Sequence, residues 1–455
     1  MNYAYLSFSY LVSSILFIIS IRGLASPETA RRGNLLGMLG MAIAIVVTMY
    51  SPLVSEYTWV LAAILAGGLI GTWSALKVKM TSLPQMIAAF NGLGGLSSVF
   101  IAIAEIMAGS QTYLETSLGM LIGAVAFSGS VIAFAKLQGL MSARALVFPG
   151  QQLLNLIIGL AVVACCIWFI ITGENQIFYI LAGLAILLGF LLILPIGGAD
   201  MPVVISVLNA YSGWAAVGIG FSLNNVLLII VGSIVGASGA ILSYIMVKAM
   251  NRSLTSVMLG GFGADAKSLQ LQDDGIKKVA KTGNPEDAAF IMENANKVII
   301  VPGYGMAVAQ AQHIVKEMAA DLHDKYGVEV KFAIHPVAGR MPGHMNVLLA
   351  EANVPYDDVF ELEDINREFA TADVAYVIGA NDVTNPQAKT NPDSPIYGMP
   401  VLDVEKAKTV FFVKRSLATG YSGVENPLFY ADNTIMLYGD AKKVTEEIVR
   451  ALEKN

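Results

Sequence analysis

The chain has 455 residues, of which 55% are hydrophobic, and it carries a formal net charge of −6 at pH 7. This hydrophobic share exceeds that of ordinary soluble domains, and the lack of any Lys/Arg tract argues against nucleic acid as a partner. Only 13 of the Asp, Glu, Lys and Arg residues precede Lys248. The composition therefore predicts an integral membrane part followed by a soluble part.

Nine apolar runs approach the ~20 residues that cross a hydrocarbon core, so they predict nine transmembrane helices. They cover residues 3–21, 34–51, 58–76, 84–108, 116–138, 151–172, 176–195, 202–221 and 226–248. The first run lacks a preceding basic region, which favours a retained span over a signal peptide. Cys165 and Cys166 are adjacent, and this spacing predicts neither a disulfide framework nor a metal site.

Basic and acidic residues alternate between successive loops. The basic ones are Arg22, Arg31, Arg32, Lys77, Lys79, Lys136 and Arg144, and the acidic ones are Glu56, Glu115 and Glu174. Since basic loops stay on the cytoplasmic side, we expect the N-terminus outside and the C-terminal domain in the cytoplasm.

Three regions follow from composition: a transmembrane domain over 1–250, a Gly-rich and charged linker over 251–290, and a soluble domain over 291–455. In the soluble domain, strand patterns alternate with helix patterns. Strands are predicted over 297–301, 328–334, near 359, 374–378, 409–413 and 434–437, and helices over 306–326, 347–353, 365–371 and 441–453. This alternation predicts a Rossmann-like α/β fold with a doubly wound parallel sheet, whose ligands bind beyond the carboxyl ends of the strands.

A glycine turn, Gly303-Tyr-Gly-Met-Ala-Val308, follows the first predicted strand and opens a helix. Gly303 permits a tight turn, and Gly305 lets backbone approach a pyrophosphate at the helix N-terminus. A plain strand-to-helix turn has the same pattern, and Val308 stands where a third small residue is usual. The surrounding strand and helix favour dinucleotide binding.

The residues at the strand ends indicate which dinucleotide the site would bind. An NAD site places Asp or Glu after the second strand, whereas this strand runs into His335 and Pro336. Lys414, Arg415 and Ser416 end a later strand, and two cations with a hydroxyl suit a 2′-phosphate. The alternative is a solvated strand end, but the missing acid and the added cations together favour NADP.

Two further loops are rich in polar groups and glycine. Arg340, in the loop from His335 to Asn346, would reach a phosphate, and Asn381 with Asp382 would lie near a nicotinamide or its ribose. Both loops could equally owe these residues to turn formation.

Polar residues within the predicted spans or close to their ends indicate a water or ion path, since such groups are costly at membrane depth. They are Asn91, Asp200, Asn225 and Glu105. The alternatives are an interhelical hydrogen bond for Asn91 and a helix N-cap for Asp200. All 4 histidines (313, 323, 335 and 344) belong to the soluble domain, so no span of this chain carries a histidine proton relay.

Several long strings give the chain a specific resemblance over essentially its whole length. They include Gly197-Gly-Ala-Asp-Met-Pro-Val, Tyr211-Ser-Gly-Trp-Ala-Ala, Pro302-Gly-Tyr-Gly-Met-Ala-Val-Ala-Gln, Pro342-Gly-His-Met-Asn-Val-Leu-Leu-Ala-Glu, Ile378-Gly-Ala-Asn-Asp and Lys414-Arg-Ser. With these strings the chain resembles the beta subunits of bacterial proton-translocating NAD(P)+ transhydrogenases. Some members of that family carry His at the position of Asn91.

The resemblance implies roles for individual residues. The nucleotide site would comprise Gly303, Tyr304, Gly305, Met306, Ala307, Val308, Arg340, Asn381, Asp382, Lys414, Arg415, Ser416, Gly420 and Tyr421, with His335, Arg340 and Asp382 in the catalytic and coupling role. Asn91, Asp200 and Asn225 would lie on or beside the proton path.

The resemblance also implies an assembly in the bacterial inner membrane. An alpha subunit would bind NAD(H), this chain would bind NADP(H), and two copies of each would assemble. The single glycine turn agrees, because hydride transfer between two nucleotides needs a second site. The reaction would be NADH + NADP+ giving NAD+ + NADPH, driven by inward proton movement, with no metal or flavin. A nucleotide-gated channel or secondary transporter is the alternative, but no carbonyl selectivity filter is evident.

Overall fold

A computed structural model describes residues 3–51, 54, 56–79, 82–142, 145–259, 279–341, 343–394, 396–420 and 422–454. Arg144, Tyr421 and positions 260–278 of the predicted linker lie outside these residues. Contacts divide the chain into two units, one of Met1–Ile196 with Val204–Ser243 and the other of Gly197–Val203 with Tyr244–Asn455.

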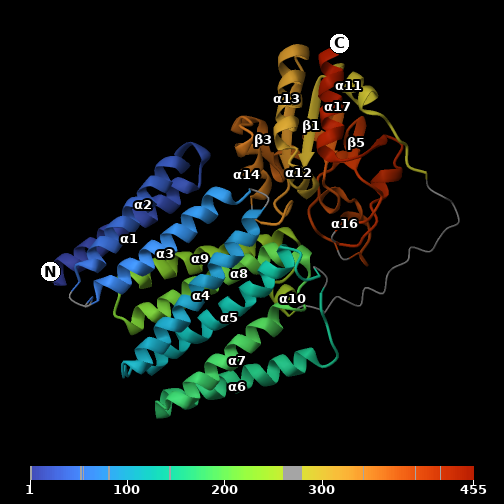
Figure 1. Cartoon of the computed structure of the whole chain (residues 1–455). Helices are drawn as coiled ribbons and strands as arrows, with labels where there is room; N and C mark the ends of the chain where they lie inside the picture. Colours follow the sequence, from blue (N-terminus) through green and yellow to red (C-terminus); the bar gives the residue numbers. More distant parts are fainter. Residues whose placement is uncertain are drawn as a thin grey trace. The chain divides into compact units, whose positions relative to one another are not determined.

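The N-terminal part of the chain is helical, as predicted (Figure 1). Within the described residues, nine helices are long and apolar enough to span a membrane. They are α1 (Tyr3–Leu24), α2 (Pro27–Met49), α3 (Tyr57–Lys77), α4 (Leu83–Met107), α5 (Tyr113–Leu137), α6 (Gln151–Thr172), α7 (Asn175–Ile193), α8 (Met201–Ser222) and α9 (Val226–Ala249). The short helix α10 (Leu254–Met258) follows them.

Small residues let α4 and α5 pack with their backbones in contact. A Cβ atom on Gly95 would lie 2.5 Å from the carbonyl oxygen of Gly123, and one on Gly123 would lie 2.7 Å from that of Gly95. No side chain fits between these backbones. In a membrane, where lipid competes with side chains for apolar contact, such close approach is a main source of helix association.

Lys136 is predicted as a loop cation, but it lies in the last turn of α5 and is only 3% exposed. Its Nζ donates to the carbonyl oxygens of Leu194 at 2.6 Å and Ile196 at 2.7 Å. These carbonyls follow the C-terminus of α7, where backbone acceptors lack helical partners. Lys136 therefore satisfies them and places its charge at the negative end of the helix dipole.

The soluble part contains one parallel sheet of six strands in the order β3-β2-β1-β4-β5-β6. The strands are β1 (Lys297–Pro302), β2 (Glu329–Ile334), β3 (Val359–Glu361), β4 (Val374–Ile378), β5 (Thr409–Lys414) and β6 (Thr434–Tyr438). This order is that of a doubly wound Rossmann-like sheet, in which the direction of strand addition reverses between β1 and β4. The predicted fold class is confirmed.

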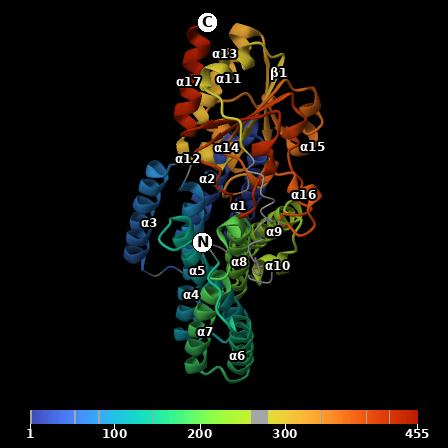
Figure 2. The same ribbon diagram turned by 90° about the vertical axis from the view of Figure 1, so that its right-hand side faces the viewer.

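Short helices cover the sheet. They are α11 (Pro285–Glu293), α12 (Tyr304–Ala309), α13 (Gln312–Tyr326), α14 (His344–Glu351), α15 (Leu362–Ile365), α16 (Gln387–Thr390) and α17 (Ala441–Lys454). α11, α13 and α17 pack against one another, and Figure 2 shows them on the side of the sheet away from α15 and α16. α11 lies partly in the stretch predicted as linker, and its Ala288 and Ala289 are fully buried in the core.

Three predicted helices differ from the structure. The helix predicted over 306–326 is broken at Gln310, whose φ of 52° is left-handed and ends α12. The helix predicted over 347–353 begins earlier, after Gly343 in the left-handed conformation. The helix predicted over 365–371 is two short pieces, α15 and a 3-10 turn at Glu368–Thr371.

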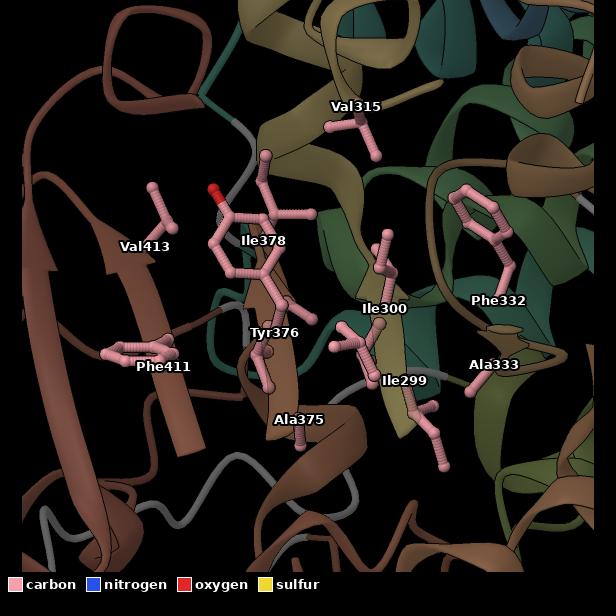
Figure 3. Packing of buried hydrophobic residues seen from close by; sticks show 14 of the residues in the cluster. Ile299, Ile300, Val315, Phe332, Ala333, Ala375, Tyr376, Ile378, Phe411 and Val413 are labelled. Atoms are coloured by element: carbon pink, nitrogen blue, oxygen red, sulfur yellow. The ribbon is translucent and has the colours of Figure 1, made fainter. Parts of the chain in front are cut away.

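The central strands are buried on both faces, as parallel strands between helices must be. Figure 3 shows Tyr376 of β4 packed among Ile300 of β1 and other apolar side chains, with Val315 of α13 on the same side. The Tyr376 hydroxyl bonds to Thr445 Oγ1 of α17 at 2.9 Å, so its buried polar atom is satisfied. This core holds β1 and β4 in register up to the pair Pro302 and Ile378.

Candidate nucleotide site

The site begins where β1 and β4 end side by side. Gly303 N–H donates to the Ile378 carbonyl and Gly305 N–H donates to the Gly379 carbonyl, each at 2.9 Å. A Cβ atom on Gly303 would lie 2.6 Å from Ala380 Cα, and one on Gly305 would lie 2.6 Å from Gly379 Cα. The glycines are expected to admit a pyrophosphate; the structure shows that they also admit the backbone of the neighbouring loop.

A cavity of about 450 Å³ lies at this carboxyl edge of the sheet, within the size range of small-molecule sites. Most of the predicted nucleotide residues line it. They are Gly303, Tyr304, Gly305, Val308, Asn381, Asp382, Lys414, Arg415, Ser416 and Gly420, joined by Val337 to Gly339, Gly379, Ala380, Thr419, Ser422 and Gly439. Residues that follow five different strands, β1, β2, β4, β5 and β6, therefore meet at one site.

Lys414 and Arg415 supply positive charge to this cavity. Lys414 Nζ donates to the Ala418 carbonyl at 2.7 Å and lies 4.4 Å from the centre of the Phe429 ring. Desolvation lowers the pKa of Lys414 to about 8. Arg415 is exposed and forms an ion pair with Asp440 at 2.8 Å. Among the described residues, no carboxylate forms an ion pair with Lys414, although Asp382 attracts it electrostatically. An anion in the cavity would further stabilise the charged form of Lys414.

Asn381 and Asp382 are held in place by the loop that follows β5. Ser422 donates to the Asp382 carboxylate from its backbone N–H at 3.0 Å and from its hydroxyl at 2.8 Å. Asn426 Nδ2 donates to Asn381 Oδ1 at 3.3 Å. Asn381 Nδ2 is buried and has no hydrogen-bond partner among the described residues. An acceptor on a ligand would satisfy this donor.

Four predicted residues do not line the cavity. Met306 and Ala307 are fully buried in the hydrophobic core behind the turn. Arg340 lies with its guanidinium carbon 4.2 Å from the centre of the ring of Tyr304, which lines the cavity. His335 is 2% exposed and lies at the base of the loop that leads to Arg340.

Backbone contacts define the protonation state of His335. Its Nε2 bonds to the Pro400 carbonyl at 2.6 Å, and its Nδ1 accepts from the Val337 N–H at 3.2 Å. Because one nitrogen must donate and the other accept, the ring is neutral. Burial lowers the pKa of His335 to about 4. His335 therefore holds the loop from residue 335 to 340 in place.

His344 has a similar buried ring at the start of α14. Its Nδ1 accepts from the Arg340 N–H at 3.1 Å, and burial lowers its pKa to about 4. Its Nε2 is buried without a hydrogen-bond partner among the described residues. Sequence reasoning does not place this histidine in the site.

The three membrane residues have specific partners. Asn91 is 8% exposed, and its Nδ2 donates to the Ile205 carbonyl of α8 at 3.4 Å. Asp200 accepts from Arg252 at 2.6 Å. Asn225 Oδ1 accepts from the Leu228 N–H at 3.2 Å, which is the pattern of an N-cap for α9.

Sequence reasoning misses Ser422, Asn426 and Asp440. Ser422 and Asn426 lie 40 and 45 positions from the residues they hold, so no local spacing indicates these contacts. Asp440 follows β6 at the same edge as Arg415. The one feature of the sequence that could have indicated Asp440 as a site residue is its position after a strand of the parallel sheet.

The described part of the chain has nine helices long and apolar enough to span a membrane. It also has a doubly wound sheet with a glycine turn and cations at its carboxyl edge. Together these features define a membrane protein with a dinucleotide-binding type of domain. The family model described as NAD(P) transhydrogenase beta subunit matches residues 6–451. Two curated proteins named NAD(P) transhydrogenase subunit beta, both from Rhodospirillum rubrum, are each 59% identical over 456 residues, covering 98% of this chain and 98% of each relative.

The chain belongs to the NAD(P) transhydrogenase beta subunit family. It is therefore a subunit of a transhydrogenase, an enzyme of nicotinamide nucleotides, and its spans indicate an inner-membrane protein. In the described ranges, no group of three or more His, Cys, Asp and Glu side chains is arranged to hold a metal ion.

The neutral state of His335 predicts an acid-sensitive soluble unit. Its pKa is about 4 in the folded protein, against 6.5 for an unperturbed histidine, so the unfolded chain binds a proton first as the pH falls. Stability should therefore decrease below pH 6.5 and level off near pH 4, by roughly 3 kcal/mol for this group. Hydrogen exchange of β1 and β4 peptides in rising urea, at pH 7 and pH 5, measures this loss in the detergent-solubilised chain.

The matched variants are His335→Gln and His313→Gln, since His313 is exposed on α13. The His335 variant should lose less stability than the wild type between the two pH values, and the His313 variant should behave as the wild type. An unchanged pH dependence in His335→Gln would show that another group is responsible.

Proposed function

We propose that the soluble unit binds NADP(H) in the cavity at the carboxyl edge of its sheet. The observation that carries this proposal is that Lys414 and Arg415 line the same cavity as the turn from Gly303 to Gly305. A 2′-phosphate is a dianion that such cations hold by charge-assisted hydrogen bonds. His335 stands after β2, where an NAD site would place an acid.

Each part of the cavity suits one part of the nucleotide. Lys414, Arg415 and Ser416 would hold the 2′-phosphate. The glycine turn, with Tyr304 and Val308, would face the pyrophosphate, and Met306 and Ala307 would support it from the core. Asn381 and Asp382 would bind the nicotinamide end. Gly420 and Tyr421 would complete the wall.

Hydride passes directly between two nicotinamides that are held in contact, so the protein's contribution is positioning and exclusion of water. No metal or flavin is needed for this transfer. The Asp382 carboxylate, fixed by Ser422, would orient the nicotinamide end. His335 and Arg340 would hold the adjoining loop, so they act on the reaction through its geometry.

The second nucleotide requires another chain. We infer that an alpha subunit carries the NAD(H) site and that two copies of each subunit assemble in the lipid bilayer. The reaction would be hydride transfer from NADH to NADP+. This inference rests on the single glycine turn of the chain, because two nicotinamides must meet for hydride transfer.

Proton movement would occur through the membrane domain, proposed over 1–250, and would be coupled to the NADP(H)-binding domain, proposed over 291–455, through the linker over 251–290. Asn91, Asp200 and Asn225 would lie on or beside this path. The loop charges favour an outside N-terminus and a cytoplasmic C-terminal domain. Protons would move inward and alter the affinity for NADP(H).

Replacing Lys414 and Arg415 with Ala tests the cofactor assignment. Each charge-assisted bond contributes about 1.5 to 3 kcal/mol, so the double variant should bind NADP(H) at least a hundredfold more weakly and NAD(H) with little change. Isothermal titration of the detergent-solubilised chain with both nucleotides measures this. Lys408→Ala is the control, because Lys408 precedes β5 at its opposite end. An equal loss for both nucleotides would contradict a 2′-phosphate role.

The single glycine turn predicts that the purified chain alone cannot transfer hydride from NADH to NADP+. Activity should appear when the NAD(H)-binding alpha subunit is added, because only then do two nicotinamides meet. The measurement is the absorbance of NADPH formed from NADH and NADP+ with each subunit separately and with both together. Robust turnover by this chain alone would reveal a second nucleotide site within it.

A further inference from the structure

A hydrogen-bonded group of five side chains joins the ends of α4, α5 and α8. Ser222 Oγ of α8 donates to Glu105 Oε2 of α4 at 3.2 Å. The same Ser222 oxygen lies 2.8 Å from Thr112 Oγ1, which precedes α5, and 2.8 Å from Thr116 Oγ1 within α5. The two threonine hydroxyls are 3.1 Å apart. Ser110 Oγ lies 2.9 Å from Thr112 Oγ1, so the carboxylate stands at the end of a connected set of four hydroxyls.

Glycine contacts bring these side chains together. A Cβ atom on Gly218 would lie 2.8 Å from Gly119 Cα, so α8 and α5 touch through their backbones about one turn from Ser222 and Thr116. Thr116 is fully buried and Ser222 is 5% exposed. Helices α5 and α8 thus hold the hydroxyls of Thr116 and Ser222, and Thr112 stands directly before α5.

Glu105 is the one charged residue of α4. The other charged side chains of α4, α5 and α8 are Glu115 in the first turn of α5 and Lys136 in its last turn. Lys136 is engaged with carbonyls after α7. A carboxyl group within a transmembrane helix is costly and commonly belongs to an ion or proton path.

The same two helices carry the predicted path residue Asn91. Asn91 of α4 bonds to Ile205 of α8, so polar contacts join α4 and α8 at two levels. Fourteen residues separate Asn91 from Glu105, which corresponds to ~21 Å along a helix. An amide side chain stays neutral as a proton passes, whereas a carboxylate binds the proton and loses its charge. A path along α4 and α8 therefore needs a titratable group, and Glu105 is the one that α4 provides.

We propose that Glu105 is the proton-collecting group at the end of the path remote from the positively charged loops, with Ser222, Thr112 and Thr116 as its relay. This inference rests on the proposed proton movement through the membrane domain. By the loop charges, this end of α4 faces outside.

The hydrogen-bond directions permit a balanced transfer. With Glu105 ionised, Ser222 donates to the carboxylate and accepts from the threonines. A proton from water neutralises Glu105, whose O–H then donates to Ser222. Ser222 takes that proton as it passes its own to Thr116 or Thr112, and that threonine gives its own proton to a water molecule of the proposed path. Glu105 is again a carboxylate, each hydroxyl has lost one proton and gained one, and rotation of the hydroxyls restores the first arrangement.

The test uses the assembled enzyme in lipid vesicles with a pH-sensitive dye inside. Glu105→Gln keeps an oxygen that accepts from Ser222 but removes the titratable group, so proton movement should fall at least about tenfold. Glu105→Asp should retain a large share of it. Glu174→Gln is the matched control, since Glu174 precedes α7 on the same proposed side and is exposed. NADP(H) affinity, measured on the same variants, should stay at the wild-type value.

Ser222→Ala provides a second, smaller change, and it should slow proton movement several-fold. If a thermal-stability measurement shows that the Glu105→Gln enzyme assembles poorly, proton movement by the Ser222→Ala enzyme tests the relay instead. Normal proton movement in a stable Glu105→Gln or Ser222→Ala enzyme would overturn the relay and leave these groups as helix-packing contacts. A wild-type enzyme that moves no protons would instead contradict the proposed function itself.

Discussion

The backbone contact between the turn after β1 and the loop after β4 is the constraint on which the soluble unit's site depends. Gly305 and Gly379 lie so close that a Cβ atom on Gly305 would come within 2.6 Å of Gly379 Cα. Two parallel strands can end this closely because their register continues to Pro302 and Ile378. The cations after β5 and the Asn381–Asp382 pair line the same cavity as this turn.

Much of this architecture could be predicted from residue patterns. The nine spans, the parallel sheet and the strand-end cations follow from apolar run length and from strand–helix alternation, which are local properties of the chain. The break at Gln310 has no glycine or proline to indicate it. The burial of Lys136 and the contact of Ser422 with Asp382 depend on residues about 40 to 60 positions away. Contacts over such distances require the fold, so residue spacing could not indicate them.

The membrane helices combine close glycine packing with sparse polar contacts. Gly95 with Gly123 and Gly119 with Gly218 bring α4, α5 and α8 together without intervening side chains. The few polar side chains at these contacts then have defined partners, as Asn91 has in α8 and Glu105 has in Ser222. Close packing of this kind leaves few polar groups between the helices, and each of these is costly at membrane depth unless it has a partner.

A structure of the full chain determined by electron cryomicroscopy with NADPH bound tests the central claim most directly. The account predicts nucleotide density in the cavity at the carboxyl edge of the sheet. The adenosine 2′-phosphate should lie within hydrogen-bonding distance of Lys414 and Arg415, and the nicotinamide should lie beside Asn381 and Asp382. Density for the nucleotide elsewhere on the chain, or a 2′-phosphate that contacts neither cation, would contradict it.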